Sequence, residues 1–187
     1  TIENVNVDVR SLYYADAIQL FDADGITITG TVNAYAESEA YGVYSTAMGT
    51  GASKNIDLTG FDITVEAPDA KGVYVEGSSN ITIADATYNI TGDKATAINM
   101  HVDWMSNIPS DITITNNNIN IDTTGDANAL YFGKANNVLV DNNHIETTGG
   151  AEININATPN AKVTNNYILI KDTMTGYFGN YAVITTE

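Results

Sequence analysis

Short alternations of apolar and polar residues recur along the whole chain, with asparagine, aspartate or glycine between them. Seven of them begin with a polar residue or glycine and continue as an apolar–variable–apolar triplet: NVNV from Asn4, GITI from Gly25, NIDL from Asn55, NITI from Asn80, DITI from Asp111, NVLV from Asn137 and NAKV from Asn160. Each is followed by a second alternation and then by a third, at 17–20, 42–45, 72–75, 97–100, 129–132, 152–155 and 182–185. An apolar residue at every second position is the pattern of a strand with one buried face. The sequence therefore predicts three short strands per repeat and no helix.

The recurrence of this three-strand unit predicts a parallel β-solenoid, in which each unit forms one coil. Strands of neighbouring coils would pair about 4.7–4.9 Å apart, and isoleucine, valine and leucine would fill the interior. A β-sandwich also contains evenly spaced short strands. It does not, however, require the three strands of every unit to recur in the same order. We therefore predict one all-β domain over residues 1–187, with about six to seven coils of three strands.

The segments DITITNNNI, NVLVDNNHI and AKVTNNYIL share one pattern, in which a short strand ends at paired asparagines and a second strand follows. This pattern resembles the repeats of the pectate-lyase-like superfamily. The resemblance covers nearly the whole chain and implies a single-stranded, right-handed parallel β-helix. The composition, rich in asparagine and threonine and without cysteine, is also similar to that of large adhesin-like surface proteins of methanogenic archaea and bacteria.

Asparagine recurs at the bend between the first and second strands of the repeats. Aligning the units on their first strands places residues that tolerate a left-handed backbone in one column, formed by Gly30, Gly60, Asp85, Asn116, Asn142 and Asn165. The next column contains Thr31, Phe61, Ala86, Asn117, Asn143 and Asn166. Because a carboxamide both donates and accepts hydrogen bonds, we expect Asn117, Asn143 and Asn166 to form a structural ladder. A ligand site at 116–118 is the alternative, but only a ladder explains why the asparagines repeat.

The chain is strongly acidic, with 23 Asp and Glu against 7 Lys and Arg and a net charge of −16. This charge would repel a phosphate backbone or an anionic lipid surface, so we expect neither nucleic acid nor membrane insertion. The absence of cysteine excludes disulfides and thiolate metal sites.

Enzymes of the superfamily cleave polysaccharides, and the resemblance therefore raises a polysaccharide lyase or glycoside hydrolase as one interpretation. Arg10 is the only arginine, and no Arg-Lys pair or compact acidic motif appears. The best local combination is His101, Asp103 and Trp104, in which a histidine and an aspartate could exchange protons and an indole could carry a sugar ring. We assign no catalytic residue and no metal. Acidic loops at 22–24 and 122–128 leave room for a loosely bound calcium ion.

The third strands present one outward column of side chains. If Val73 and Val75 point inward, the outward residues in this column are Gln19, Tyr44, Tyr74, Asn99, Tyr131, Asn154 and Ile184. Tyrosines and amides can stack on and hydrogen-bond a glycan, although tyrosine is also a good strand former on any exposed sheet. The candidate ligand-binding residues are therefore Tyr44, Tyr74, Asn99, His101, Trp104, Tyr131 and Asn154. The loops within 33–54 and 101–110 vary most in length and rank second as contact regions.

These observations favour a non-enzymatic segment of an extracellular cell-surface or cell-wall protein. We expect the solenoid to act as a stiff spacer, with one side that binds a cell-surface glycan or a protein of a host or partner cell. A purely structural stalk is the remaining alternative. Neither end of the sequence resembles a cap, so we expect a fragment of a longer protein that stacks end to end with further coils.

Overall fold

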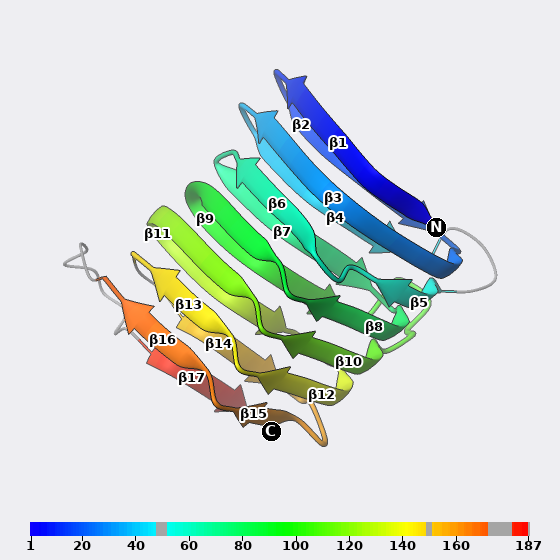
Figure 1. Ribbon diagram of the computed structural model, residues 1–187. Helices are drawn as coiled ribbons and strands as arrows, with labels where there is room; N and C mark the ends of the chain where they lie inside the picture. The colour runs from blue at the N-terminus through cyan, green and yellow to red at the C-terminus, as the bar shows by residue number, and fades with distance from the viewer. Residues whose placement is uncertain (48–51, 149–150, 172–180, 187) are drawn as a thin grey trace.

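The computed structural model describes residues 1–47, 52–148, 151–171 and 181–186, and these residues form a stack of parallel coils with the two termini at opposite ends (Figure 1). The strands are β1 (Ile2–Ser11), β2 (Tyr14–Phe21), β3 (Asp24–Ala36), β4 (Glu39–Thr46), β5 (Lys54–Asp57), β6 (Phe61–Glu66), β7 (Asp69–Glu76), β8 (Ser79–Ala84), β9 (Thr87–His101), β10 (Ser110–Thr115), β11 (Asn118–Phe132), β12 (Asn136–Asp141), β13 (His144–Thr147), β14 (Ala151–Asn156), β15 (Lys162–Thr164), β16 (Tyr167–Ile170) and β17 (Tyr181–Thr186). No helix long and apolar enough to cross a membrane occurs in the described ranges.

The strands form three faces that run along the stack, and every pairing between neighbouring coils is parallel. Face 1 consists of the start of β3 followed by β5, β8, β10, β12 and β15. Face 2 consists of β1, the end of β3, β6, the starts of β9 and β11, β13 and β16. Face 3 consists of β2, β4, β7, the ends of β9 and β11, β14 and β17. The predicted all-β solenoid with three strand segments per coil is thereby confirmed.

The predicted register is wrong in the first two coils. NVNV does not open face 1, because Val5 pairs with Gly30 and Val7 with Val32, which places β1 on face 2. Gly30, in turn, pairs with Phe61, so the column that was predicted to contain Thr31 contains Gly30 instead. A two-residue alternation fits any of the three faces equally well, and only the pairing between coils decides which face it joins.

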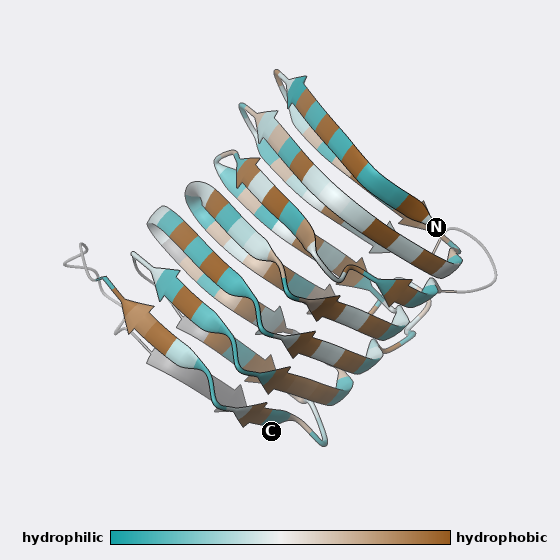
Figure 2. Cartoon of the chain, viewed as in Figure 1, coloured by the Kyte–Doolittle hydropathy of each residue, from teal (hydrophilic) through white to brown (hydrophobic). Residues whose placement is uncertain are grey.

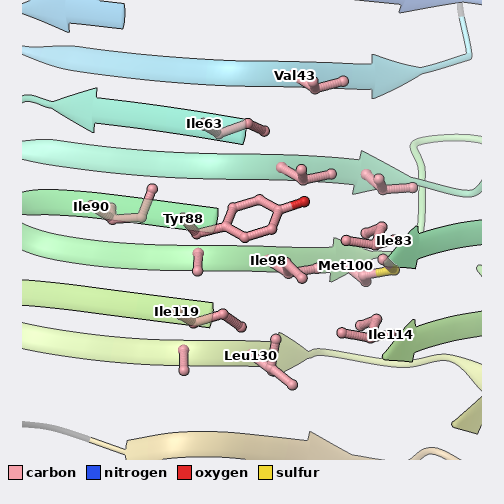
Figure 3. Close-up of a cluster of buried hydrophobic side chains, with 14 of the residues drawn as sticks. Val43, Ile63, Ile83, Tyr88, Ile90, Ile98, Met100, Ile114, Ile119 and Leu130 are labelled. Carbon is pink, nitrogen blue, oxygen red and sulfur yellow. The ribbon is translucent and has the colours of Figure 1, made fainter. Parts of the chain in front are cut away.

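The interior is a continuous apolar core made by every second residue of each strand. Brown and teal bands alternate along the strands in Figure 2, as a pattern with one buried face requires. Val73 and Val75 point inward and are 0% and 2% exposed. Tyr88 takes the inward position that Ile63 and Ile119 hold in the neighbouring coils, and it lies among buried aliphatic side chains (Figure 3).

Left-handed residues mark two corners of almost every coil. At the entry to face 1, positive φ angles occur at Gly25, Asn55, Asn80, Asp111, Asn137 and Asn160. At the corner between faces 1 and 2 they occur at Asn4, Gly30, Gly60, Asp85, Asn116, Asn142 and Asn165. Glycine, asparagine and aspartate adopt this conformation at least cost, so these residue types bend the chain at the same place in successive coils.

A buried ladder of carboxamides lies just inside the second of these corners. Asn117 Nδ2 donates to Asn143 Oδ1, and Asn143 Nδ2 donates to Asn166 Oδ1, both at 2.9 Å. Each Oδ1 also accepts a backbone N–H of the preceding coil, from Ala86, Asn117 and Asn143 respectively. The amide groups also donate to carbonyl oxygens at the end of the face 1 strands, such as that of Ile83. The ladder therefore satisfies backbone groups that the bend removes from the strand pairing.

Asn143→Ala removes the middle of this ladder and leaves the N–H of Asn117 and the carbonyl of Ile114 without a partner. We expect the free energy of unfolding to fall by about 1–3 kcal/mol, because unpaired buried polar groups are costly. Denaturant titration would measure the change. Asn120→Ala, on the outer surface of face 2, is the matched control and should change stability much less. An Asn143→Ala variant as stable as the parent would contradict this role.

Tyr88→Phe should stabilise the protein. The Tyr88 side chain is 0% exposed, and its hydroxyl has no hydrogen-bond partner among the described residues. Replacing it with phenylalanine keeps the ring and removes the buried hydroxyl, so we expect an increase of about 1 kcal/mol in the free energy of unfolding. Tyr35→Phe, on the outer surface, should leave the denaturation midpoint unchanged, and a destabilised Tyr88→Phe protein would show that its hydroxyl is paired.

Candidate functional site

Face 3 carries two outward columns of large side chains because its strands contain a repeated irregularity. In β4, Gly42 and Val43 are both buried, so Tyr41 and Tyr44 both point outward although they are three residues apart. The same step recurs in β7, β9 and β11, where Val73, Ile98 and Leu130 continue the inward column of Val43. At Gly42 a Cβ would lie 2.7 Å from the Gly72 carbonyl oxygen, so the backbones approach closely here and any side chain would require the backbone to shift.

The outward side chains of face 3 form a chain of ring contacts that we call the aromatic row: Phe21, Tyr41, Tyr44, Tyr74, His101 and Tyr131. Tyr44 pairs in register with Tyr74, and their ring centroids are 5.5 Å apart. His101 lies between Tyr74 and Tyr131, at 5.6 and 5.1 Å. Rings in neighbouring coils therefore contact one another along face 3.

Carboxylates hold the tyrosine hydroxyls of the row in place. Glu76 accepts hydrogen bonds from Thr46 Oγ1 at 2.7 Å and from the Tyr74 hydroxyl at 3.1 Å. Glu39 accepts a hydrogen bond from the Tyr41 hydroxyl and pairs with Lys71 at 2.7 Å. Burial, with these carboxylates, raises the pKa of Tyr41 and Tyr74 well above the ordinary tyrosine value. Both hydroxyls therefore remain protonated donors.

Lys71 contacts tyrosines of both outward columns, Tyr41 and Tyr74. Its Nζ lies 2.7 Å from both Glu39 and Asp69 and 4.8 Å from the centroid of the Tyr41 ring. Burial alone would raise the pKa of Glu39, but the hydrogen bonds from Lys71 and Tyr41 outweigh it and the pKa is lowered. The charged groups at the centre of the aromatic row thus serve to position the rings.

The amide residues predicted in the outward column lie beneath and beside the rings. Asn99 pairs in register with Tyr74 and Tyr131 and is only 8% exposed, and Asn154 is the next residue of the column. Oδ1 of Asn99, Asn154 and the adjacent Asn128 has no hydrogen-bond partner among the described residues. These three oxygens lie in successive coils and are buried, so they are unpaired acceptors inside face 3 and are not open to solvent. The side chain of Ile184, at the end of the predicted column, lies outside the described residues.

Trp104 lies in the loop 102–109, which joins β9 to β10, and is 73% exposed. Its indole Nε1 donates to the carbonyl oxygen of Ala47, at the end of β4, at 3.0 Å. The loop itself is fixed by Asp103, whose carboxylate accepts hydrogen bonds from the backbone N–H groups of Met105 and Asn107. The indole is thus exposed but held in one orientation. The predicted loop 33–54 is mostly strand, because β3 continues to Ala36 and β4 spans Glu39–Thr46, and residues 48–51 lie outside the described residues.

A polar groove of about 590 Å³ lies between this loop and the corner that leads to face 1. Its polar lining includes Asp22, Asp24, Lys54, Asn107 and Ser110. Lys54 and Asp24 form an ion pair at 3.3 Å across an exposed surface. The groove is lined by hydroxyl, amide and carboxylate groups that can hydrogen-bond a polar molecule.

The structure does not bring His101 and Asp103 together as a proton-transfer pair. The Asp103 carboxylate binds its own loop, with Oδ2 accepting from Asn107 Nδ2 at 2.7 Å, whereas His101 packs in the aromatic row. No group of three or more His, Asp and Glu residues that could hold a metal ion occurs within the described ranges. Residues 122–128, predicted as an acidic loop, lie inside the continuous strand β11, and the side chain of Asp126 lies outside the described residues.

The family comparison agrees with this geometry. The family described as right handed beta helix region matches residues 52–173, more than half of the chain. The chain belongs to this family. The match confirms the resemblance to right-handed parallel β-helix repeats that the asparagine-rich motifs indicated. No curated protein and no solved structure matched the sequence.

Sequence reasoning missed Phe21 and Tyr41 as members of the aromatic row. It also missed Glu39, Glu76 and Lys71 as the charged groups that contact the row. Strict alternation places Tyr41 on the opposite side of the strand from Tyr44, because the two positions are three apart, which is an odd number of steps. The signal that could have corrected this is a small residue before each inward apolar residue, as in Gly42-Val43 and Gly72-Val73. A repeated small residue at one strand position indicates close backbone approach or a bulge.

The free energy of unfolding should decrease as the pH is lowered through the range where histidine titrates. Burial lowers the pKa of His101, an effect that the nearby charge of Glu76 opposes and that of Lys71 reinforces. The unfolded chain therefore binds this proton at higher pH than the folded protein does. The free energy of unfolding should be constant above about pH 7 and fall from about pH 6.5 downward. Denaturant titrations across this range would measure it, and the decrease should be smaller in His101→Phe; equal pH dependence in both proteins would contradict it.

Proposed function

We propose that this chain is a non-catalytic segment of an extracellular surface protein that acts as a stiff spacer and binds carbohydrate on face 3 and the adjoining loop. The observation that carries the binding proposal is Trp104, a highly exposed indole held in a fixed orientation by its bond to Ala47. An exposed aromatic ring whose polar atom is already paired offers its faces to the apolar side of a sugar ring. Restricting its rotation in advance reduces the entropy lost on binding.

The surroundings of Trp104 supply the polar part of such a site. The groove beside its loop presents side chains such as Asn107, Ser110 and Lys54, which can donate to or accept from sugar hydroxyls. On face 3, the partly exposed side chains of Tyr131 and Asn154 add an aromatic ring and an amide group. Ligand sites of this kind combine apolar surface with a few polar groups that fix orientation.

The non-catalytic part of the proposal rests on the use of the carboxylates. Glu39 and Glu76 accept hydrogen bonds from tyrosines of the aromatic row, and Asp103 binds the backbone of its own loop. A carboxylate committed in this way positions side chains and is poorly placed to transfer a proton to a substrate. The spacer part rests on the unbroken parallel pairing from β1 to β17, which a rod that transmits length and direction requires.

Binding of the full chain to an array of neutral and acidic glycans would test the carbohydrate proposal. We expect Trp104→Ala to weaken binding of any glycan captured by the parent by about tenfold or more, equal to about 1.4 kcal/mol. Tyr74→Ala and Tyr131→Ala should weaken it as well if the ligand extends over the aromatic row. Tyr167→Ala is the matched control, because Tyr167 is an exposed aromatic residue stacked on His144 on face 2.

The outcomes separate the parts of the proposal. Loss of binding in Trp104→Ala with normal binding in Tyr167→Ala supports a carbohydrate site at the loop. Equal binding by the parent and Trp104→Ala would contradict it. Release of shortened or unsaturated sugars from a bound polysaccharide would contradict the non-catalytic assignment and favour the lyase or hydrolase interpretation.

A further inference from the structure

We propose that Asn89, on face 2, is a site of N-linked glycosylation, independently of whether face 3 binds carbohydrate. Asn89, Ile90 and Thr91 form an Asn-x-Thr sequence, the acceptor motif for this modification. In the reaction, Nδ2 of asparagine forms a bond to C1 of the first sugar of a polyprenyl-diphosphate-linked oligosaccharide. The sugar–phosphate bond breaks, the polyprenyl diphosphate leaves, and the proton lost by Nδ2 passes to a base of the transferase.

The strand geometry places the acceptor residues on the solvent side. Residues two apart on a strand share a face, and both Asn89 and Thr91 are exposed, whereas Ile90 between them is buried in the core. An attached sugar would therefore project outward from the surface of face 2 without disturbing the apolar interior.

The hydrogen bonding of Asn89 leaves Nδ2 available. Its Oδ1 accepts from Asn120 Nδ2 at 3.1 Å, and no residue of the described ranges accepts a bond from its own Nδ2. Glycosylation replaces one of the two hydrogens on Nδ2 and keeps the carbonyl oxygen, so the bond from Asn120 persists. A modified Asn89 is thus compatible with the folded coil.

A groove of about 340 Å³ begins at Asn89 and offers room for the first sugar. Asn120, Asp122 and Thr148 line it with amide, carboxylate and hydroxyl groups that can hydrogen-bond sugar hydroxyls. Asn120 pairs in register with Asn89, and Asp122 pairs with Thr91, so the groove crosses face 2 towards the next coils. This surface lies on a different face from the aromatic row.

The sequence contains two further Asn-x-Thr motifs, which begin at Asn80 and Asn156, and both are placed less favourably than Asn89. Asn80, in the sequence Asn80-Ile81-Thr82, donates through Nδ2 to Asn55 Oδ1 at 2.6 Å and adopts a left-handed backbone at a corner. A sugar on its Nδ2 would crowd this contact. Asn156, at the end of β14, is partly buried. We therefore expect Asn89 to be the occupied position.

The test uses the full chain, exported by a host that has an oligosaccharyltransferase, with intact-mass measurement and mass-spectrometric mapping of glycopeptides. We expect a mass above that of the unmodified chain, a glycan mapped to Asn89, and conversion of Asn89 to aspartate when the glycan is released by an amidase. Asn89→Gln and Thr91→Ala should remove this glycan. Thr91→Ser keeps the motif and Asn120→Gln leaves it intact, so both should retain the glycan.

An exported protein with the unmodified mass would overturn the inference. So would a protein that carries glycans only at Asn80 or Asn156. Because Asn89→Gln changes an exposed side chain, the circular dichroism spectrum and denaturation midpoint of that variant should match those of the enzymatically deglycosylated parent, which shows that the lost mass is not a consequence of misfolding.

Discussion

Parallel hydrogen bonding between successive coils is the constraint on which the rest of this structure depends. Each strand pairs in register with the equivalent strand of the next coil, so every side chain has a counterpart about 4.7–4.9 Å away along the stack. A residue type that suits this spacing can be repeated, whereas an unpaired polar group inside the stack would be costly. Aliphatic residues fill the interior, and carboxamides occupy the buried position where the bend between faces 1 and 2 leaves backbone groups without partners.

The ladders of carboxamides have a direction, which explains where aspartate replaces asparagine. In the exposed corner ladder, Asn142 donates to Asn116, and Asn116 donates to Asp85, so each coil donates to the coil before it. The ladder at the entry to face 1 runs the same way, from Asn160 through Asn137 to Asp111. A carboxylate can only accept hydrogen bonds, and it stands at the receiving end of both series. The buried ladder runs in the opposite direction, from Asn117 to Asn166.

The surfaces that differ from the repeat are the places where specific recognition can arise. The loop 102–109 is longer than the equivalent turns at 77–78, 133–135 and 157–161. Asp103 makes it a fixed structure that carries Trp104. Close approach at Gly77 is part of this arrangement, because a Cβ there would lie 2.5 Å from Asp103 Oδ2. The aromatic row likewise depends on the small residues of face 3. Repetition builds the rod, and a few positions with small or acidic residues shape its surface.

The sequence by itself determined the architecture and, from Gly60 onward, the corner columns. Alternating apolar residues define strands, and residues such as Asn116 and Asn142 define bends, because both properties depend on local backbone and side-chain chemistry. Most of the outward column of face 3 was predictable for the same reason, including the registration of Tyr44, Tyr74 and Tyr131. Only the tertiary structure decided that β1 belongs to face 2, that Tyr41 joins the aromatic row, and that Asp103 binds its own loop. The first two depend on contacts between coils, about which a period of two carries no information. The third depends on how the irregular loop folds on itself, and a strand pattern does not describe a loop.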